Sequence, residues 1–205
     1  MTENKPSAEH YFSPRPKSKP KFGLIRTRLR GVPFEFATSS SVFSKKRVDT
    51  GTRLLVETML LPKTGDVLDV GCGYGAVGIA AAAFNPNLKV LLTDVNMRAV
   101  RLAKENVERN RIANAEVRWG YLYEPVEELS FDCILSNPPV SAGMETVKAV
   151  ITEAPKVMAP RGTLQMVVRS KISGKLLPAV LEAAFGNCAV LARGSGYRVL
   201  VAEKR

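Results

Sequence analysis

From residue 66 onward, short apolar runs alternate with amphipathic segments, a pattern typical of strands alternating with helices. The runs of strand length, rich in valine, leucine and isoleucine, predict buried parallel strands at residues 67–70, 89–93, 115–119, 131–136 and 163–169. Apolar positions three or four residues apart predict helices at residues 76–84, 96–110, 144–158 and 175–185. A closing strand pair is predicted at residues 188–192 and 197–201. Together these elements predict an α/β fold with a doubly wound, mostly parallel seven-stranded sheet.

Upstream of this region the pattern changes. Residues 24–29 and 32–37 are β-like runs on either side of Arg30-Gly31, and they predict a hairpin. Asp49 or Thr50 can cap a helix that runs to about Leu61, before Pro62. We therefore expect a basic N-terminal arm and hairpin over residues 1–48, followed by one α/β domain over residues 49–205.

Positive charge is concentrated in the arm and hairpin. The 205-residue chain has a formal net charge of +11, and residues 1–47 hold eleven Lys or Arg against three Glu. This surplus of eight predicts a polyanionic partner such as RNA, because phosphate contacts gain from counterion release. A tail that only improves solubility is the alternative.

Several classes of protein are disfavoured by composition. No apolar run approaches the ~20 residues that cross a membrane. The polar N-terminus lacks the apolar core of a signal peptide, so we expect a cytoplasmic protein without membrane association. Cys72, Cys133, Cys188 and the single His10 do not have metal-ligand spacing, so we expect no metal site.

A glycine-rich segment, Asp69-Val-Gly-Cys-Gly-Tyr-Gly75, follows the first predicted parallel strand and opens a helix. Glycine lets a turn adopt positive φ and approach a ligand closely, which predicts a site for a nucleotide-like cofactor. Asp94 ends the next strand, where its carboxylate can accept hydrogen bonds from a ribose diol. Asp69 lies inside the strand end and can receive an ammonium group. The glycines and Ala76 also fit the dinucleotide pattern G-x-G-x-x-G/A, so NAD stays open at this point.

Ser136-Asn-Pro-Pro139 ends another buried strand, at the edge of the sheet where ligands bind. The two prolines donate no N–H and hold Asn137 extended. The Asn137 side-chain oxygen and the Pro138 carbonyl then form a rigid pair of acceptors for the two N–H groups of a planar amine. Asn137, Pro138 and Pro139 are therefore the predicted catalytic residues for methyl transfer to nitrogen.

The glycine segment resembles the first motif of class I S-adenosylmethionine-dependent methyltransferases. With Phe43-Ser44, Asp49-x-Gly51-Thr52 and Asn137-Pro-Pro139, the chain resembles the small-domain methyltransferases typified by RsmC-type ribosomal RNA guanine-N2 enzymes. The resemblance covers roughly residues 10–202. It implies S-adenosylmethionine as cofactor and a guanine exocyclic amine in RNA, expected to be ribosomal RNA, as acceptor. The predicted cofactor residues are Asp69, Gly71, Cys72, Gly73, Gly75, Asp94, Val95, Gly120, Tyr121 and Asn137.

Three features depart from the family pattern, two of them at single positions. Tyr121 stands where relatives often carry an acidic or amide residue that binds the adenine amine. Val140 stands where many amine methyltransferases have an aromatic residue that stacks on a flipped base. The additional N-terminal domain of the RsmC-type enzymes is expected to be absent. The predicted substrate-binding residues are Phe43, Arg169, Lys171, Tyr197 and Arg198.

Three other functions remain open. A protein glutamine methyltransferase also uses Asn-Pro-Pro, usually followed by Tyr, which Val140 disfavours. A non-catalytic RNA-binding module with the same fold would not need Asn137 beside an intact glycine segment. An NAD-linked oxidoreductase would need an acid or base for hydride transfer, and the sequence offers no such candidate.

Overall fold

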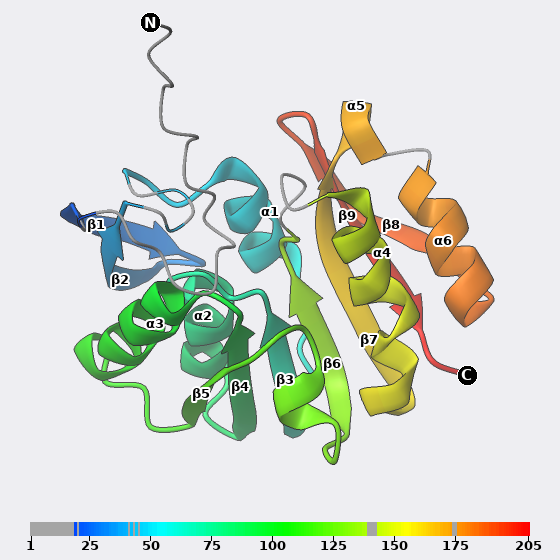
Figure 1. The fold of residues 1–205 in the computed structure, drawn as a ribbon, viewed down its shortest axis with the longest axis horizontal. Helices are drawn as coiled ribbons and strands as arrows, with labels where there is room; N and C mark the ends of the chain where they lie inside the picture. The colour runs from blue at the N-terminus through cyan, green and yellow to red at the C-terminus, as the bar shows by residue number, and fades with distance from the viewer. Residues whose placement is uncertain are drawn as a thin grey trace, which may run out of the picture.

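The computed structural model describes residues 19, 21–40, 42, 44, 46–138, 143–173 and 176–205, and the fold is shown in Figure 1. The strands are β1 (Phe22–Leu29), β2 (Val32–Ser39), β3 (Gly65–Val70), β4 (Leu88–Asp94), β5 (Ala115–Trp119), β6 (Phe131–Ser136), β7 (Met158–Arg169), β8 (Ala189–Gly194) and β9 (Tyr197–Glu203). The α-helices are α1 (Thr50–Thr58), α2 (Ala76–Phe84), α3 (Met97–Arg109), α4 (Met144–Thr152), α5 (Ser170–Ser173) and α6 (Leu176–Phe185). Two short 3-10 helices are η1 (Glu124–Val126) and η3 (Ala154–Val157).

The central sheet has seven strands in the order β5-β4-β3-β6-β7-β9-β8. The first five of these pair in parallel, whereas β9 pairs antiparallel with both β7 and β8. The chain leaves β3 in one direction through β4 and β5 and then returns to the other side of β3 through β6 and β7. The switch point therefore lies between β3 and β6, and their carboxyl ends are the expected place for a ligand. The predicted doubly wound, mostly parallel seven-stranded sheet is confirmed.

Helices cover both faces of this sheet (Figure 1). On one face, α1, α2, α3 and the hairpin share a core cluster in which Phe36, Leu55, Ile79 and Leu92 are fully buried. On the other face, α4 and α6 pack over Ile134 and other residues of the second cluster. Neighbouring residues along a strand go to opposite clusters because side chains alternate across a strand. Two-sided burial explains why these strands are continuous apolar runs.

The β1–β2 hairpin is joined to α3 by two asparagine side chains. Asn106 accepts from the Ala37 N–H (2.7 Å) and donates to the Ala37 carbonyl (2.9 Å). Asn110, one helical turn later, makes the same pair of bonds with Glu35. The two amides thus stand where a third strand would pair with β2. Asn106 also donates to the Tyr74 carbonyl, which ties the hairpin to the glycine segment (2.9 Å).

One predicted helix was wrong in its extent. The helix predicted over residues 144–158 ends at Thr152, and Met158 already belongs to β7 and pairs with Phe131. Pro155 is the physical reason, because it has no N–H for a helical bond and restricts the residue before it. The apolar spacing continued past this point because Ala154 and Met158 are buried in the same cluster although they are not in one helix.

The helix that follows Asp49 is also shorter than predicted. It ends at Thr58, and Leu60 instead exchanges hydrogen bonds with the buried Gln165 amide (2.9 and 2.7 Å). This side-chain pairing draws the chain out of the helix before Pro62. The strand predicted over residues 163–169 is longer than expected, because β7 already begins at Met158. The remaining predicted elements agree with the structure within one or two residues at their ends, and α5, η1 and η3 were not predicted. No helix in the described part of the chain is long and apolar enough to cross a membrane.

Candidate functional site

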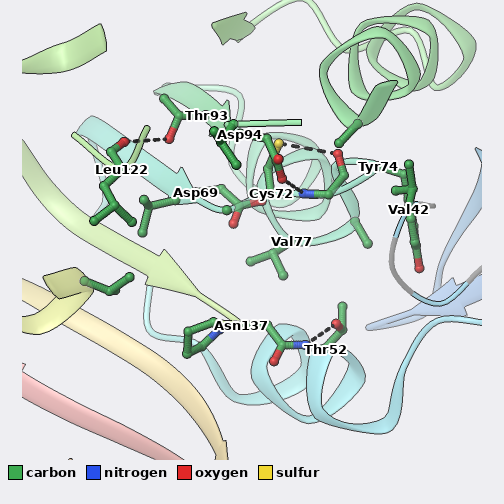
Figure 2. Close-up of a pocket in the computed structure, with 18 of the residues that line it drawn as sticks. Val42, Thr52, Asp69, Cys72, Tyr74, Val77, Thr93, Asp94, Leu122 and Asn137 are labelled. Carbon is green, nitrogen blue, oxygen red and sulfur yellow. Dashed lines mark hydrogen bonds between the residues drawn. The ribbon is translucent and has the colours of Figure 1, made fainter. Parts of the chain in front are cut away.

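A cavity of about 360 Å³ opens at the carboxyl ends of β3, β4 and β6, beside the switch point of the sheet. Its volume falls in the ~300–1,000 Å³ range of small-molecule sites. Figure 2 shows Asn137 and Thr52 across this cavity from Asp69 and Asp94. The topology therefore brings the two sequence motifs to the two sides of one cavity.

The glycine segment forms one wall through an unusual backbone. Gly71, Gly73 and Gly75 have φ values of +73°, +59° and +94°, which residues with a Cβ rarely adopt. Two carboxylates hold this loop. The Gly73 N–H donates to Asp94 Oδ2, and the Gly78 N–H in α2 donates to Asp69 Oδ2, both at 2.8 Å. The loop is therefore fixed in shape before any ligand binds.

Asp69 is fully buried and Asp94 is partly buried, and neither carboxylate has a cationic partner among the described residues. Burial raises the pKa of Asp69 to about 7, although the Gly78 N–H opposes the shift. Burial also raises the pKa of Asp94 to about 6, against the hydrogen bonds from the Asn96 and Gly73 N–H groups. No ion pair within the described residues involves either side chain. A buried acid in this state fits a cationic ligand group, which would favour its ionised form.

The raised pKa of Asp69 predicts a pH-dependent stability. An unfolded chain loses this proton near pH 3.8 and the folded chain near 7, so the folded state binds more protons between these values. The ligand-free protein should therefore lose on the order of a few kcal/mol of stability relative to Asp69→Asn as pH rises from about 4 to about 8. Denaturant unfolding of both proteins across this range tests the expectation. Parallel stability curves would contradict it.

The opposite wall is built around Asn137, directly after β6. The buried Ser136 hydroxyl donates to the Val70 carbonyl (3.0 Å), which holds the end of β6 against the end of β3. The Asn137 Nδ2 donates to Thr52 Oγ1 (2.8 Å) and to Asp49 Oδ2 (3.3 Å) in the first turn of α1. With both bonds on Nδ2, the side-chain oxygen Oδ1 remains for a ligand.

Apolar and aromatic side chains close the remaining wall. Val95, Tyr121 and Leu122 follow β4 and β5, and they line the cavity together with Val150 of α4. Trp119 lies beside them and donates from Nε1 to the Val95 carbonyl (2.8 Å). This wall offers flat apolar surface suited to an aromatic base.

Most of the predicted cofactor residues line this cavity: Asp69, Gly71, Cys72, Gly73, Asp94, Val95, Tyr121 and Asn137. Pro138 lines it as well, whereas Pro139 lies outside the described residues. Gly75 and Gly120 are not among the lining residues. A Cβ at Gly75 would lie 2.8 Å from Ile79, and one at Gly120 would lie 2.7 Å from the Pro125 ring. For these two glycines, direct contact with a cofactor stays a prediction.

The predicted substrate residues lie elsewhere. Phe43 is outside the described residues, and Arg169, Lys171, Tyr197 and Arg198 do not line the cavity. The Arg169 guanidinium lies over the Tyr197 ring, 5.4 Å from its centre. The Tyr197 ring packs against Gly51, where a Cβ would approach it to 2.8 Å. Their role in substrate binding stays a prediction.

Several cavity residues were not selected from the sequence, among them Val42, Thr52, Tyr74, Val77, Leu122, Thr146 and Val150. The sequence did contain a signal for Thr52, because Thr52 is the last residue of the motif Asp49-x-Gly51-Thr52. Thr146 and Val150 lie one helical turn apart in α4 and look like ordinary helix positions in the sequence. Among the residues that the structure describes, no cluster of His, Cys, Asp and Glu could hold a metal ion.

The sequence and the fold have counterparts in known proteins. The family model described as "Methyltransferase small domain" matches residues 33–201. The Bacillus subtilis protein YbxB, which is uncharacterised, is 36% identical over 199 residues, covering 96% of this chain and 99% of its own. The ribosomal RNA small subunit methyltransferase C of Photorhabdus laumondii is 32% identical over 82% of this chain.

A solved structure matches most of the fold. It is the Thermus thermophilus 16S rRNA N2 G1207 methyltransferase (RsmC) in complex with AdoMet and guanosine, with a TM-score of 0.81, 27% identity and 93% of this chain covered. This chain spans about half the length of the RsmC-type proteins, namely 49% of the Photorhabdus sequence and 52% of the Thermus chain.

Proposed function

Since the chain belongs to the methyltransferase small-domain family, we propose that it transfers a methyl group from S-adenosylmethionine to the N2 amine of a guanine in ribosomal RNA. One observation carries this proposal: a cavity with the carboxylates of buried Asp69 and partly buried Asp94 on one wall and an Asn-Pro acceptor pair on the other. The relatives named as ribosomal RNA methyltransferases support the RNA substrate. The cytoplasmic location expected from the sequence belongs to the same proposal.

The residues of the glycine wall fit S-adenosylmethionine. Asp69 would hold the ammonium of its methionine part, and Asp94 would accept from its ribose hydroxyls. Both Asp94 oxygens already accept one backbone N–H each, but every carboxylate oxygen has a second lone pair. Val95, Tyr121 and Leu122 would enclose the adenine. The bound cofactor supplies an electrophilic methyl group on a sulfonium.

The residues of the other wall act on the acceptor amine. Asn137 Oδ1 and the Pro138 carbonyl would accept its two N–H groups and fix the nitrogen with its lone pair toward the methyl group. Both oxygens also stabilise the positive charge that develops on nitrogen during transfer. Rate enhancement then comes from orientation and electrostatics, and no base is required before transfer. After the N–C bond has formed, the cationic nitrogen would lose its proton to water, and the cofactor without its methyl group would leave as a neutral thioether.

Transfer of a tritiated methyl group from S-adenosylmethionine to RNA tests the proposal directly. Ribosomal RNA, transfer RNA and total protein serve as parallel acceptors, and mass spectrometry of nucleosides identifies the modified base. We expect N2-methylguanosine in ribosomal RNA. Label found only in protein would favour glutamine methylation, and the absence of transfer to any acceptor would favour a binding module.

A basic surface beside the cavity supports RNA as the substrate. Arg26 of β1, Lys46, Arg47 and Arg53 of α1 line a shallow hollow between the hairpin and the start of α1. Thr52 lines the cavity from the same first turn of α1, so the hollow adjoins the active site. An RNA backbone bound in this hollow would keep the target nucleotide close to Asn137.

Reversing two charges in this hollow should weaken RNA binding. For the double variant Lys46→Glu with Arg47→Glu we expect a large loss of RNA affinity. We also expect the plot of log binding constant against log salt concentration to become shallower by about 1.5–2 in slope, as for two lost phosphate contacts. The matched control is Lys63→Glu with Lys89→Glu, which changes the net charge equally at exposed positions near the amino ends of β3 and β4. Equal salt slopes for the two double variants would contradict this placement of the RNA.

A further inference from the structure

The side-chain amide of Asn137 is held from behind by the first turn of α1. Its Nδ2 donates to Thr52 Oγ1 at 2.8 Å and to Asp49 Oδ2 at 3.3 Å (Figure 2 shows the first contact). Thr52 is buried. It precedes Asn137 by 85 residues in the sequence, and Asp49 precedes Asn137 by 88 residues. The two partners of Asn137 lie outside both the glycine segment and Asn-Pro-Pro.

The two partners act on the amide in different ways. A hydroxyl both donates and accepts, so Thr52 alone could face either end of the Asn137 amide. A carboxylate only accepts, so Asp49 can face the NH₂ group but not the oxygen. The pair therefore excludes the rotamer in which the amide is turned over, and Oδ1 must point away from α1.

Asp49 is itself fixed. The same Oδ2 accepts from the Gly51 and Thr52 N–H groups (2.9 and 3.2 Å) as the N-cap of α1. Gly51 lets the Tyr197 ring of β9 pack against this turn, because a Cβ there would lie 2.8 Å from the ring. The first turn of α1 therefore packs between Asn137 on one side and Tyr197 of β9 on the other. The three named residues of Asp49-x-Gly51-Thr52 therefore have distinct roles. Asp49 caps α1, Gly51 leaves room for the Tyr197 ring, and Thr52 accepts from Asn137.

We propose that Asp49 and Thr52 are positioning residues that orient the Asn137 amide, so that its oxygen and not its NH₂ faces the acceptor nitrogen. This inference rests on the proposed function, since it assumes that Asn137 Oδ1 grips an amine. An amide turned over would present two donors to an amine that also donates, and the acceptor would be repelled. Orientation of Asn137 therefore determines turnover more than it determines cofactor binding.

Thr52→Val tests the role of the hydroxyl with almost no change in volume. We expect kcat to fall about tenfold, as for one lost hydrogen bond to a buried group, with the cofactor Kd changed less than about twofold. Thr52→Ser keeps the hydroxyl and should restore most of kcat. Thr58→Val is the matched control: its hydroxyl bonds the Leu54 carbonyl (2.7 Å) on the same helix, and kcat should stay unchanged.

Asp49→Ser tests the carboxylate separately. Serine caps a helix about as well as aspartate, so α1 should keep its stability. Its shorter side chain cannot reach Asn137, and kcat should fall severalfold without a comparable change in Tm.

The outcomes separate the two hypotheses. If the wild-type protein transfers no methyl group to RNA, the proposed function fails. If wild type is active and Thr52→Val keeps its kcat, the positioning role fails while the function stands. A loss of kcat that Thr52→Ser does not restore, or that follows a matching loss of cofactor affinity or Tm, also contradicts the positioning role.

Discussion

Asn137→Ala is expected to lower the methyl-transfer rate by at least about 10²–10³-fold, the effect of removing one preorganised transition-state acceptor. The cofactor should still bind with nearly the wild-type Kd, because the glycine wall is built from β3, β4 and α2 and does not depend on this side chain. Single-turnover transfer to RNA, together with a calorimetric titration of S-adenosylmethionine, measures both quantities.

Asn187→Ala is the matched control for this change. In the described part of the chain, the Asn187 side chain hydrogen-bonds only backbone groups of Phe185 and Glu203. None of these three residues lines the cavity. We expect its removal to reduce stability by about 1–2 kcal/mol and to leave the rate per folded molecule unchanged. Unchanged turnover in Asn137→Ala would overturn the acceptor mechanism.

Asp94→Ala should instead weaken cofactor binding strongly. Alanine removes the acceptor of the Gly73 N–H and the Asn96 N–H, both at 2.8 Å, and with them the oxygens proposed for the ribose. Hydrogen bonds to a charged group contribute about 1.5–3 kcal/mol each, so we expect the Kd to rise at least about 100-fold. Isothermal titration calorimetry at fixed pH measures the change.

The control for this variant is Asp132→Ala. Asp132 also accepts a backbone N–H, that of Asp66 at 2.8 Å, but at the opposite end of β3 and β6. It should bind the cofactor like wild type. If the cofactor Kd of Asp94→Ala lies within about threefold of that of Asp132→Ala, Asp94 does not contact the cofactor. The loss of even one hydrogen bond to a charged group would raise the Kd by more than about threefold.

The sequence predicted those cavity residues that lie at the end of a parallel strand or directly after it. Asp69, Asp94 and Asn137 each lie at or just after the end of a parallel strand, and the doubly wound topology then brings strand ends together. Apolar runs identify such strands because both of their faces are buried. Local sequence therefore contains most of the information that places these three side chains.

Contacts made by side-chain amides could not be predicted in this way. Gln165 ends α1 early by pairing with Leu60, and Asn106 holds the hairpin, yet nothing in the local sequence distinguishes them from surface residues. The orientation of Asn137 likewise depends on Asp49 and Thr52, which are distant in sequence. Periodicity also failed at Pro155, because burial of Met158 continues a helical spacing after the helix has ended.

The pairing of Asn106 and Asn110 with β2 determines where the chain can be shortened. A protein that begins after the hairpin would leave both asparagine amides without their partners on Ala37 and Glu35 and would uncover the aromatic core around Phe36. Deletions designed to remove positive charge should therefore stop before Lys21, whose carbonyl accepts from the Ser40 N–H and whose N–H donates to Ser40 Oγ. We therefore expect the basic hairpin to fold together with the α/β domain, so its charges have to be changed residue by residue.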